Sequence, residues 1–221
     1  NTTGSSFNVA SGGTVNTSTS SVIDGQLHVS GAATIAGTVT SNGDVEVQTG
    51  GTVTMTSTAV LNQTAITNNG ALVVDRSAGQ NWSVAMSGTA PSAVTKQGDG
   101  TLTLSGNAAV NAITVDQGKV VVNGNFSDAA VQLLTDTAFG GSGTVGALGG
   151  SGSVNPGNSP GILTASQIDP TGGMSFNFEF TAVNTYPNWS DAANSINDVL
   201  HLTSGTPFTS DLTSANVINV Y

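Results

Sequence analysis

The side chains that could perform acid–base chemistry are few and scattered along this chain. Two glutamates, Glu46 and Glu179, lie far apart, and the other acidic residues are aspartates that occur mostly singly beside turn formers. The basic residues are Arg76, Lys96 and Lys119. Enzymes that cleave polysaccharides need clustered carboxylates, and lyases also need cations that stabilise a developing anion. This spacing favours turn-forming aspartates and solvated surface cations, so we expect no catalytic residues.

Thiol and metal chemistry also find no support in the sequence. The chain has no cysteine, which excludes disulfides, thiolate catalysis and cysteine-bound zinc. His28 and His201 have no partner at metal-ligand spacing, and the calcium-binding run Gly-Gly-x-Gly-x-Asp is absent. We therefore expect no metal site, no cofactor and no enzymatic activity; a degenerate polysaccharide enzyme is the weakest of the functional hypotheses.

The charge balance restricts the partners of the protein. The formal net charge is −10, and charged residues make up 7% of the 221 residues, against roughly 25% in ordinary soluble proteins. Three cations cannot neutralise a row of phosphates, so we expect no nucleic acid partner. No apolar run approaches the length of a transmembrane helix, so membrane insertion is not expected. Because Asn1 opens a polar stretch and is not Met, we expect an exported protein, extracellular or at the cell surface, whose signal peptide has been removed.

The elements that position these residues are marked by a recurring phrase of glycine, a small or polar residue and an apolar β-former. The phrase begins at Gly13, Gly37, Gly51, Gly70, Gly100, Gly118 and Gly143. Its spacing scatters around roughly twenty residues, as expected when each unit is one coil of a solenoid. We therefore predict that the apolar residues of the phrase point into a core formed by stacked coils. These residues are Val15, Val39, Val53, Leu72, Leu102, Val120 and Val145.

The pattern between the phrases predicts an all-β fold. Short strands with period-two alternation are separated by turn residues, and helix signals are almost absent. A β-sandwich also fits short strands, but the phrase, the many small residues and an aromatic content of only 5% favour a parallel β-solenoid. We predict coils over residues 1–169. A longer loop, or a strand pair that leaves the stack, is expected at 75–95, where Trp82, Met86 and Pro91 interrupt the pattern.

Several runs resemble a known bacterial repeat. Residues Lys96 to Gly106 read Lys-Gln-Gly-Asp-Gly-Thr-Leu-Thr-Leu-Ser-Gly, Ile113 to Asn123 supplies a second strand, and Gly150 to Thr164 contains Pro-Gly-Asn-Ser-Pro-Gly. These runs are similar to the autotransporter-associated β-strand repeat, and Asn197 to Leu202 is similar to C-terminal segments of that family. The resemblance implies an exported bacterial surface protein with a right-handed parallel β-helix.

Large aromatic residues gather in the segment 170–221. Phe176, Phe178 and Phe180 alternate with polar residues on a predicted strand, Trp189 lies in a predicted loop, and Tyr221 is the last residue given. Because a solenoid has two open ends, this aromatic-rich segment is either a cap over the last coil or a contact surface for another subunit. These five aromatic residues are the candidate contact residues.

Two functions remain open at this stage. The first is an extracellular structural protein, a fibre or surface-layer subunit that forms a head-to-tail homopolymer by end-to-end stacking or strand addition. The second is an adhesin or carbohydrate-binding passenger fragment that binds a surface polysaccharide. A fibre subunit needs complementary ends, whereas an adhesin needs a groove or loop with exposed aromatic residues.

Overall fold

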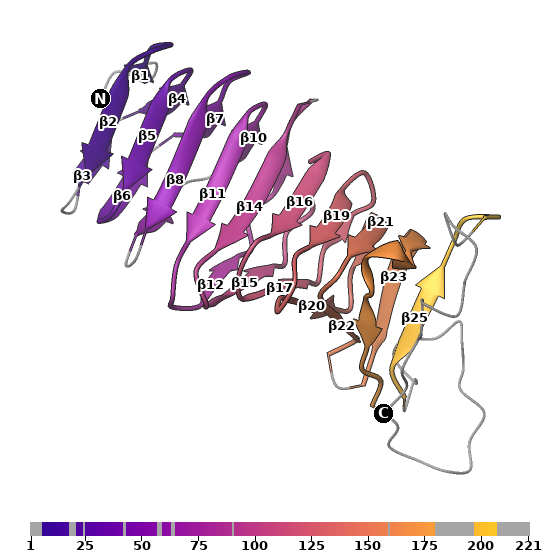
Figure 1. Cartoon of the computed structure of the whole chain (residues 1–221). Coiled ribbons are helices and arrows are strands. Elements are labelled where there is room, and N and C mark those ends of the chain that lie inside the picture. Colours follow the sequence, from indigo (N-terminus) through magenta and orange to yellow (C-terminus); the bar gives the residue numbers. More distant parts are fainter. Residues whose placement is uncertain are drawn as a thin grey trace.

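The computed structural model describes residues 6–17, 21–23, 25–41, 43–56, 59–62, 65–89, 91–158, 160–179 and 197–206. These residues form a parallel β-solenoid of about eight turns with essentially no helix, which confirms the predicted fold class. Figure 1 shows the strands stacked side by side from β1 to β25 along one elongated body. The described residues include no helix long and apolar enough to cross a bilayer.

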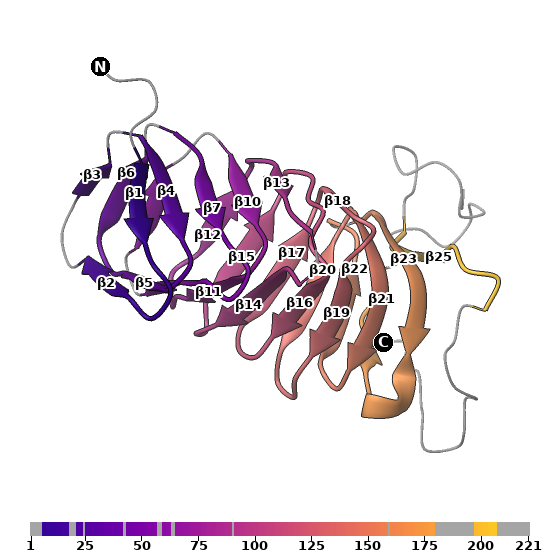
Figure 2. The same ribbon diagram turned by 90° about the horizontal axis from the view of Figure 1, so that it is seen from above.

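Three sheets surround the first coils: sheet A, sheet C and sheet B, which runs along the whole body. Sheet A contains β1 (Ser6–Val9), β4 (Gln26–Val29), β7 (Val45–Val47), β10 (Ile66–Asn68) and β13 (Met86–Ser87). Sheet C contains β3 (Ser21–Ile23), β6 (Thr38–Ser41) and β9 (Val60–Asn62). Sheet A and sheet B lie on different sides of the body in Figure 2.

Sheet B runs along the whole body, and sheet D replaces sheet C in the later coils. Sheet B contains β2 (Thr14–Thr17), β5 (Ala32–Ile35), β8 (Thr52–Thr56), β11 (Ala71–Asp75), β14 (Ala93–Gln97), β16 (Ala112–Val115), β19 (Ala130–Leu133), β21 (Thr144–Gly150), β23 (Ile162–Asp169) and β25 (Val199–Leu202), with β18 (Asn125–Phe126) paired to β21. Sheet D contains β12 (Gln80–Trp82), β15 (Thr101–Leu104), β17 (Lys119–Val122), β20 (Ala138–Gly141), β22 (Ser153–Pro156) and β24 (Ser175–Phe176). The short 3-10 helix η1 (Pro170–Gly172) follows β23.

The core is built from rows of inward-facing residues held in register across the coils. One row of sheet B stacks Val15, Ala33, Val53, Leu72, Val94, Ile113, Val131, Leu148 and Ile168. Side chains alternate between the two faces of a strand, so every second residue enters this row or its neighbour. Of the seven residues predicted to point inward, all are buried except Val15, which lies partly buried in the first coil.

The glycine of the recurring phrase permits the corners of successive coils to stack. A Cβ atom at Gly51 would lie 2.1 Å from the carbonyl oxygen of Val29, and one at Gly70 would lie 2.4 Å from that of Gly51. The backbone of the preceding coil therefore passes too close for any side chain at Gly51, Gly70, Gly100, Gly118 and Gly143. This contact explains why an apolar strand residue follows the glycine at a fixed distance.

In the segment 75–95, the described residues 75–89 and 91–95 continue the stack, so the expected loop or strand pair that leaves it is not seen among them. Strands β12, β13 and β14 pair in parallel with strands of neighbouring coils. Trp82 and Met86 are buried in the common core. Trp82 lies on β12, the first strand of sheet D, and Met86 lies on β13, the last strand of sheet A, so both large residues fill the interior where the sheets change.

The described part of the segment 170–221 continues the same stack. Strand β24 extends sheet D from β22, and β25 extends sheet B from β23, both in parallel register. The expected strand over 195–203 is present as β25 at Val199–Leu202, whereas 195–196 lie outside the described residues. The expected final strand at 216–221 also lies outside them.

Candidate functional site: the two ends of the solenoid

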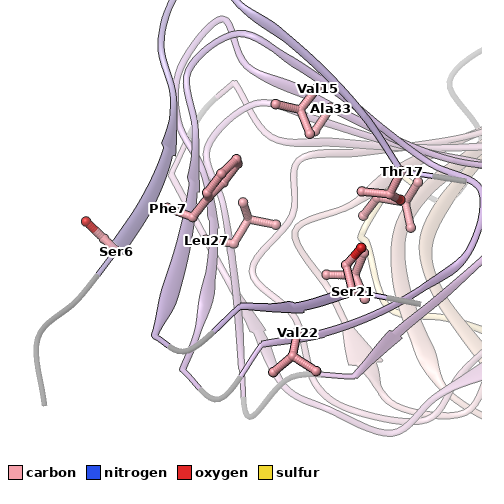
Figure 3. Close-up of a pocket in the computed structure, with 10 residues that line it drawn as sticks. Ser6, Phe7, Val15, Thr17, Ser21, Val22, Leu27 and Ala33 are labelled. Atoms are coloured by element: carbon pink, nitrogen blue, oxygen red, sulfur yellow. The ribbon is translucent and has the colours of Figure 1, made fainter. Parts of the chain in front are cut away.

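The N-terminal end of the core opens into an apolar cavity. The cavity has a volume of about 350 Å³ and is lined by residues of the first two coils. Figure 3 shows Phe7, Val15 and Leu27 facing the space, with Val22 at its rim. Phe7 is 43% exposed and Val22 is 72% exposed. Apolar side chains in this position leave surface that a further coil would cover.

The strands of the first coil are paired on one side. Within the described residues, β1, β2 and β3 pair with β4, β5 and β6 and with no other strand. The other edge of each strand presents backbone N–H and C=O groups that a further parallel strand could pair with. The segments Ser6–Val9, Thr14–Thr17 and Ser21–Ile23 contain no charged residue and no proline, the usual devices that block such pairing.

The C-terminal end presents the other edge of sheet B, at β25, which pairs with Ile162–Ala165 of β23. Strand β25 pairs with β23 and, within the described residues, with no other strand. Val199 is buried, while Leu200 and Leu202 are partly buried against the core. This strand, Val-Leu-His-Leu, also has no proline and no Lys, Arg, Asp or Glu. Among the described residues, both end strands of sheet B, β2 and β25, therefore have one edge without a paired strand.

A buried carboxylate anchors β25 to the stack. Asp198 is 6% exposed. Its Oδ1 accepts a hydrogen bond from the backbone N–H of Gly161 at 3.1 Å, and its Oδ2 accepts one from that of Glu179 at 2.8 Å. Burial raises the pKa of Asp198 above its ordinary value, although these two hydrogen bonds oppose the shift. The carboxylate thus joins the Pro-Gly-Asn-Ser-Pro-Gly corner to the Asn-Asp-x-Leu-x-Leu run, a link that the sequence did not reveal.

The five candidate contact residues differ in burial and in whether they belong to the described part of the chain. Phe176 is 2% exposed and pairs with Val154 in the core row of sheet D. Phe178 is partly buried, and its ring lies 6.3 Å from that of Phe176 at an interplanar angle of 19°. Phe180, Trp189 and Tyr221 lie outside the described residues. Phe176 therefore contributes to the interior and offers no surface to a partner.

Lys96 is buried, so the prediction of a solvated side chain is wrong. It occupies an inward position on β14 between Val74 and Val115 and is 1% exposed. Its Nζ donates hydrogen bonds to the carbonyl oxygens of Arg76, Gln97 and Gly98. Burial lowers the pKa of Lys96, and the charges of nearby aspartates partly offset this shift. The ammonium group holds the corner that follows β14.

Arg76 is also buried, at the junction where sheet C stops and sheet D starts. Its guanidinium donates to the carbonyl oxygen of Ala59 and, at 2.5 Å, to Oε1 of Gln80. Burial lowers its pKa. The Nε of Arg76 and the Nε1 of Trp82 are buried without a hydrogen-bond partner among the described residues. Lys119, by contrast, is partly exposed on sheet D.

The two histidines lie on different strands, His28 on β4 and His201 on β25. His28 Nδ1 lies 2.7 Å from Glu46 Oε2 in a cross-strand pair on sheet A, and His201 is exposed on β25. Across the described residues, no group of three or more His, Asp or Glu side chains is arranged to hold a metal ion. The pair of His28 and Glu46 is a surface contact between neighbouring coils.

Comparisons with known proteins found no counterpart: no protein-family model, curated protein or solved structure matches the chain. The resemblance to the autotransporter-associated β-strand repeat therefore stays a prediction from its motifs.

Proposed function

We propose that the protein is an extracellular structural subunit that assembles head to tail into a filament. The observation that carries this proposal is the continuity of sheet B, which ends at β2 on one side and at β25 on the other with both edges unpaired among the described residues. Two copies related by a shift along the solenoid axis keep the same strand direction. The edge of β25 in one copy can then pair with the edge of β2 in the next.

The apolar groups at the two ends support the same arrangement. Leu200 and Leu202 are partly buried at one end, and Phe7, Val15 and Val22 border the cavity at the other. Covering a large apolar side chain contributes about 1.5–3 kcal/mol before the cost of association. Because the two surfaces differ, the contact is heterologous and repeats without closure, which produces an open filament.

The test compares the assembly of the natural sequence with variants of the N-terminal rim. Light scattering and negative-stain microscopy of the full chain should show fibres that lengthen with protein concentration. Phe7→Asp and Val15→Asp should abolish them, because each would place a charge among the inward-facing residues at the open end. Asn8→Asp is the control, since Asn8 is exposed on β1 and flanks Phe7 on the outer face. A strictly monomeric natural protein at high concentration, or fibres formed equally by the rim variants, would refute the proposal.

A further inference from the structure

A polar groove lies on the C-terminal half of the body, away from the open N-terminal end. It has a volume of about 310 Å³, and its lining includes Lys119, Asn155, Asn158, Asn177, Phe178 and Glu179. These residues come from β17, β22 and the segments that follow β22 and β24. We name this surface the amide groove. We propose that the amide groove binds a neutral oligosaccharide.

The register of sheet D creates the hollow. On β20, Ala138 pairs with Lys119 of β17 on one side, and Gly140 pairs with Asn155 of β22 on the other. These two small residues are the outward-facing positions of β20, so no long side chain stands between Lys119 and Asn155. A Cβ atom at Gly140 would lie 2.4 Å from the carbonyl oxygen of Asn155, so no larger residue fits there.

The amides of the groove are held with their oxygen atoms available. Asn177 Nδ2 donates to Asn155 Oδ1 at 3.1 Å, and Asn158 Nδ2 donates to Asn123 Oδ1 at 2.8 Å and to Ser142 Oγ at 3.1 Å. With their nitrogen atoms engaged, Asn158 and Asn177 offer Oδ1 acceptors that receive no hydrogen bond from any described residue. Sugar hydroxyls donate to such fixed acceptors.

The groove also offers an apolar face and a hydrogen-bond donor. The ring of Phe178 is stacked on that of Phe176, whose burial in the core fixes the pair. An aromatic ring held at the edge of a polar groove suits the C–H face of a pyranose, while neighbouring polar groups set its orientation. The ammonium of Lys119 has no hydrogen-bond or ion-pair partner among the described residues, so it can donate to hydroxyl or ring oxygens.

The charge of the groove decides between neutral and acidic sugars. Glu179 and Asp198 line it against the single cation Lys119, and the whole chain carries a net charge of −10. Both carboxylate oxygens of Asp198 accept hydrogen bonds from backbone N–H groups, one of them that of Glu179. Asp198 is therefore a positioning residue that holds Glu179 in place. A uronate or sulfated polymer would meet net negative charge here, whereas a neutral sugar would not.

The test is binding of the full chain to immobilised neutral hexose and N-acetylhexosamine oligomers, with polygalacturonate as the acidic probe. We expect at least one neutral oligomer to bind and polygalacturonate not to bind. Phe178→Ala and Asn177→Ala should each weaken this binding by about tenfold or more, as for anchor residues of other interfaces. The matched control is Asn81→Ala, because Asn81 lies at the far end of the same outward row of sheet D.

Each outcome decides the question, and circular dichroism checks that the variants are folded. Binding lost in Asn177→Ala and kept in Asn81→Ala supports the amide groove even where Phe178→Ala fails to fold. Absence of binding to every neutral oligomer, equal binding by Asn177→Ala and the natural chain, or stronger binding of polygalacturonate would overturn the proposal. Because the groove includes Asp198, which directly precedes the edge strand β25, binding is also measured with Phe7→Asp, which should not assemble. Binding by this variant separates the amide groove from filament formation.

Discussion

The first and last coils share sheet B but differ in how their cores are closed. In the first coils, three sheets surround an interior row that begins with Val15 and Ala33, and the end of that row opens into a cavity of about 350 Å³. In the last coils, sheet D packs Phe139 and Phe176 into the interior, and Asp198 fastens a further strand over it. The inward-facing residues therefore decide whether the core at one end of the solenoid is filled or opens into a cavity.

The junction between the two regions is made by buried cations. Arg76 binds the backbone before β9 and the side chain of Gln80, while Lys96 binds carbonyl groups of its own corner and of the preceding coil. Each cation donates to backbone carbonyl groups at or next to the ends of strands. A chain with three basic residues therefore places two of them inside.

The largest expected effect comes from a charge in the continuous row of sheet B. Val53 is fully buried. Val53→Asp should lower the free energy of unfolding by more than about 5 kcal/mol, because it leaves an unpaired carboxylate in the core. Val22→Asp is the control, since Val22 is exposed at the rim, and it should change the stability by less than about 0.5 kcal/mol. Chemical denaturation measures both; a Val53→Asp variant as stable as the natural protein would contradict the inward row.

The filled and open ends should respond differently to the loss of one aromatic ring. Phe139→Ala should cost about 3–5 kcal/mol, because Phe139 is fully buried between Val120 and Val154. Phe7→Ala should cost far less, since nearly half of that side chain is exposed. Denaturant unfolding at a concentration below assembly measures both losses. Equal losses would mean that the N-terminal end is as well packed as the C-terminal one.

A smaller effect is expected at the junction. Lys96→Met should lower stability by about 1–3 kcal/mol, because it removes the ammonium that serves the carbonyl of Gly98 while keeping the aliphatic chain. Lys119→Met provides the matched control on the partly exposed face of sheet D and should be close to neutral. A gain in stability of Lys96→Met would show that the cost of burying the ammonium exceeds the value of its hydrogen bonds.

The smallest effect concerns pH and the anchor of β25. Burial raises the folded pKa of Asp198 above its ordinary value of 3.8. A raised pKa means that the folded state binds the proton more tightly, so this stabilising contribution is fully present below pH 3.8 and is lost as the pH rises through the folded pKa. The stability of the natural protein relative to Asp198→Asn should therefore be greatest in acid and decline towards neutral pH. Unfolding curves of both proteins over this pH range measure the difference, and the opposite slope would contradict the assignment.

The repeating features of the fold could be predicted from the sequence because they are local. A glycine at a crowded corner and an apolar residue two positions later leave their pattern in every coil. The burial of Lys96 was missed because a count of cations says nothing about their position. The period of two does place Lys96 on the same face of β14 as Val94, and this was the signal available.

The amide groove could not be predicted because its residues come together through register. Asn155 and Asn177 meet only when β22 and β24 are aligned, and Asp198 reaches Glu179 across a long stretch of chain. The motif resemblance singled out the runs that contain Pro156 and Asp198, but it gave no contact between them. The alternation of Phe176 and Phe178 was visible, yet their division between core and groove depends on where β24 ends.

The central claim, head-to-tail continuation of sheet B, is tested most directly by disulfide trapping in this cysteine-free chain. Asn16→Cys and His201→Cys place thiols on the exposed faces of β2 and β25. Adjacent parallel strands lie about 4.8 Å apart, which is within the reach of a disulfide. Thr14→Cys, on the same face of β2, tests a pairing of the two strands that is shifted by two residues. Under oxidising conditions, the variant with cysteines at both ends should form a ladder of disulfide-linked multimers. A mixture of the two single variants should form disulfide-linked dimers, and each single variant alone should form no covalent multimer. A double variant that stays monomeric in both registers, or dimers formed by one single variant alone, would contradict head-to-tail assembly.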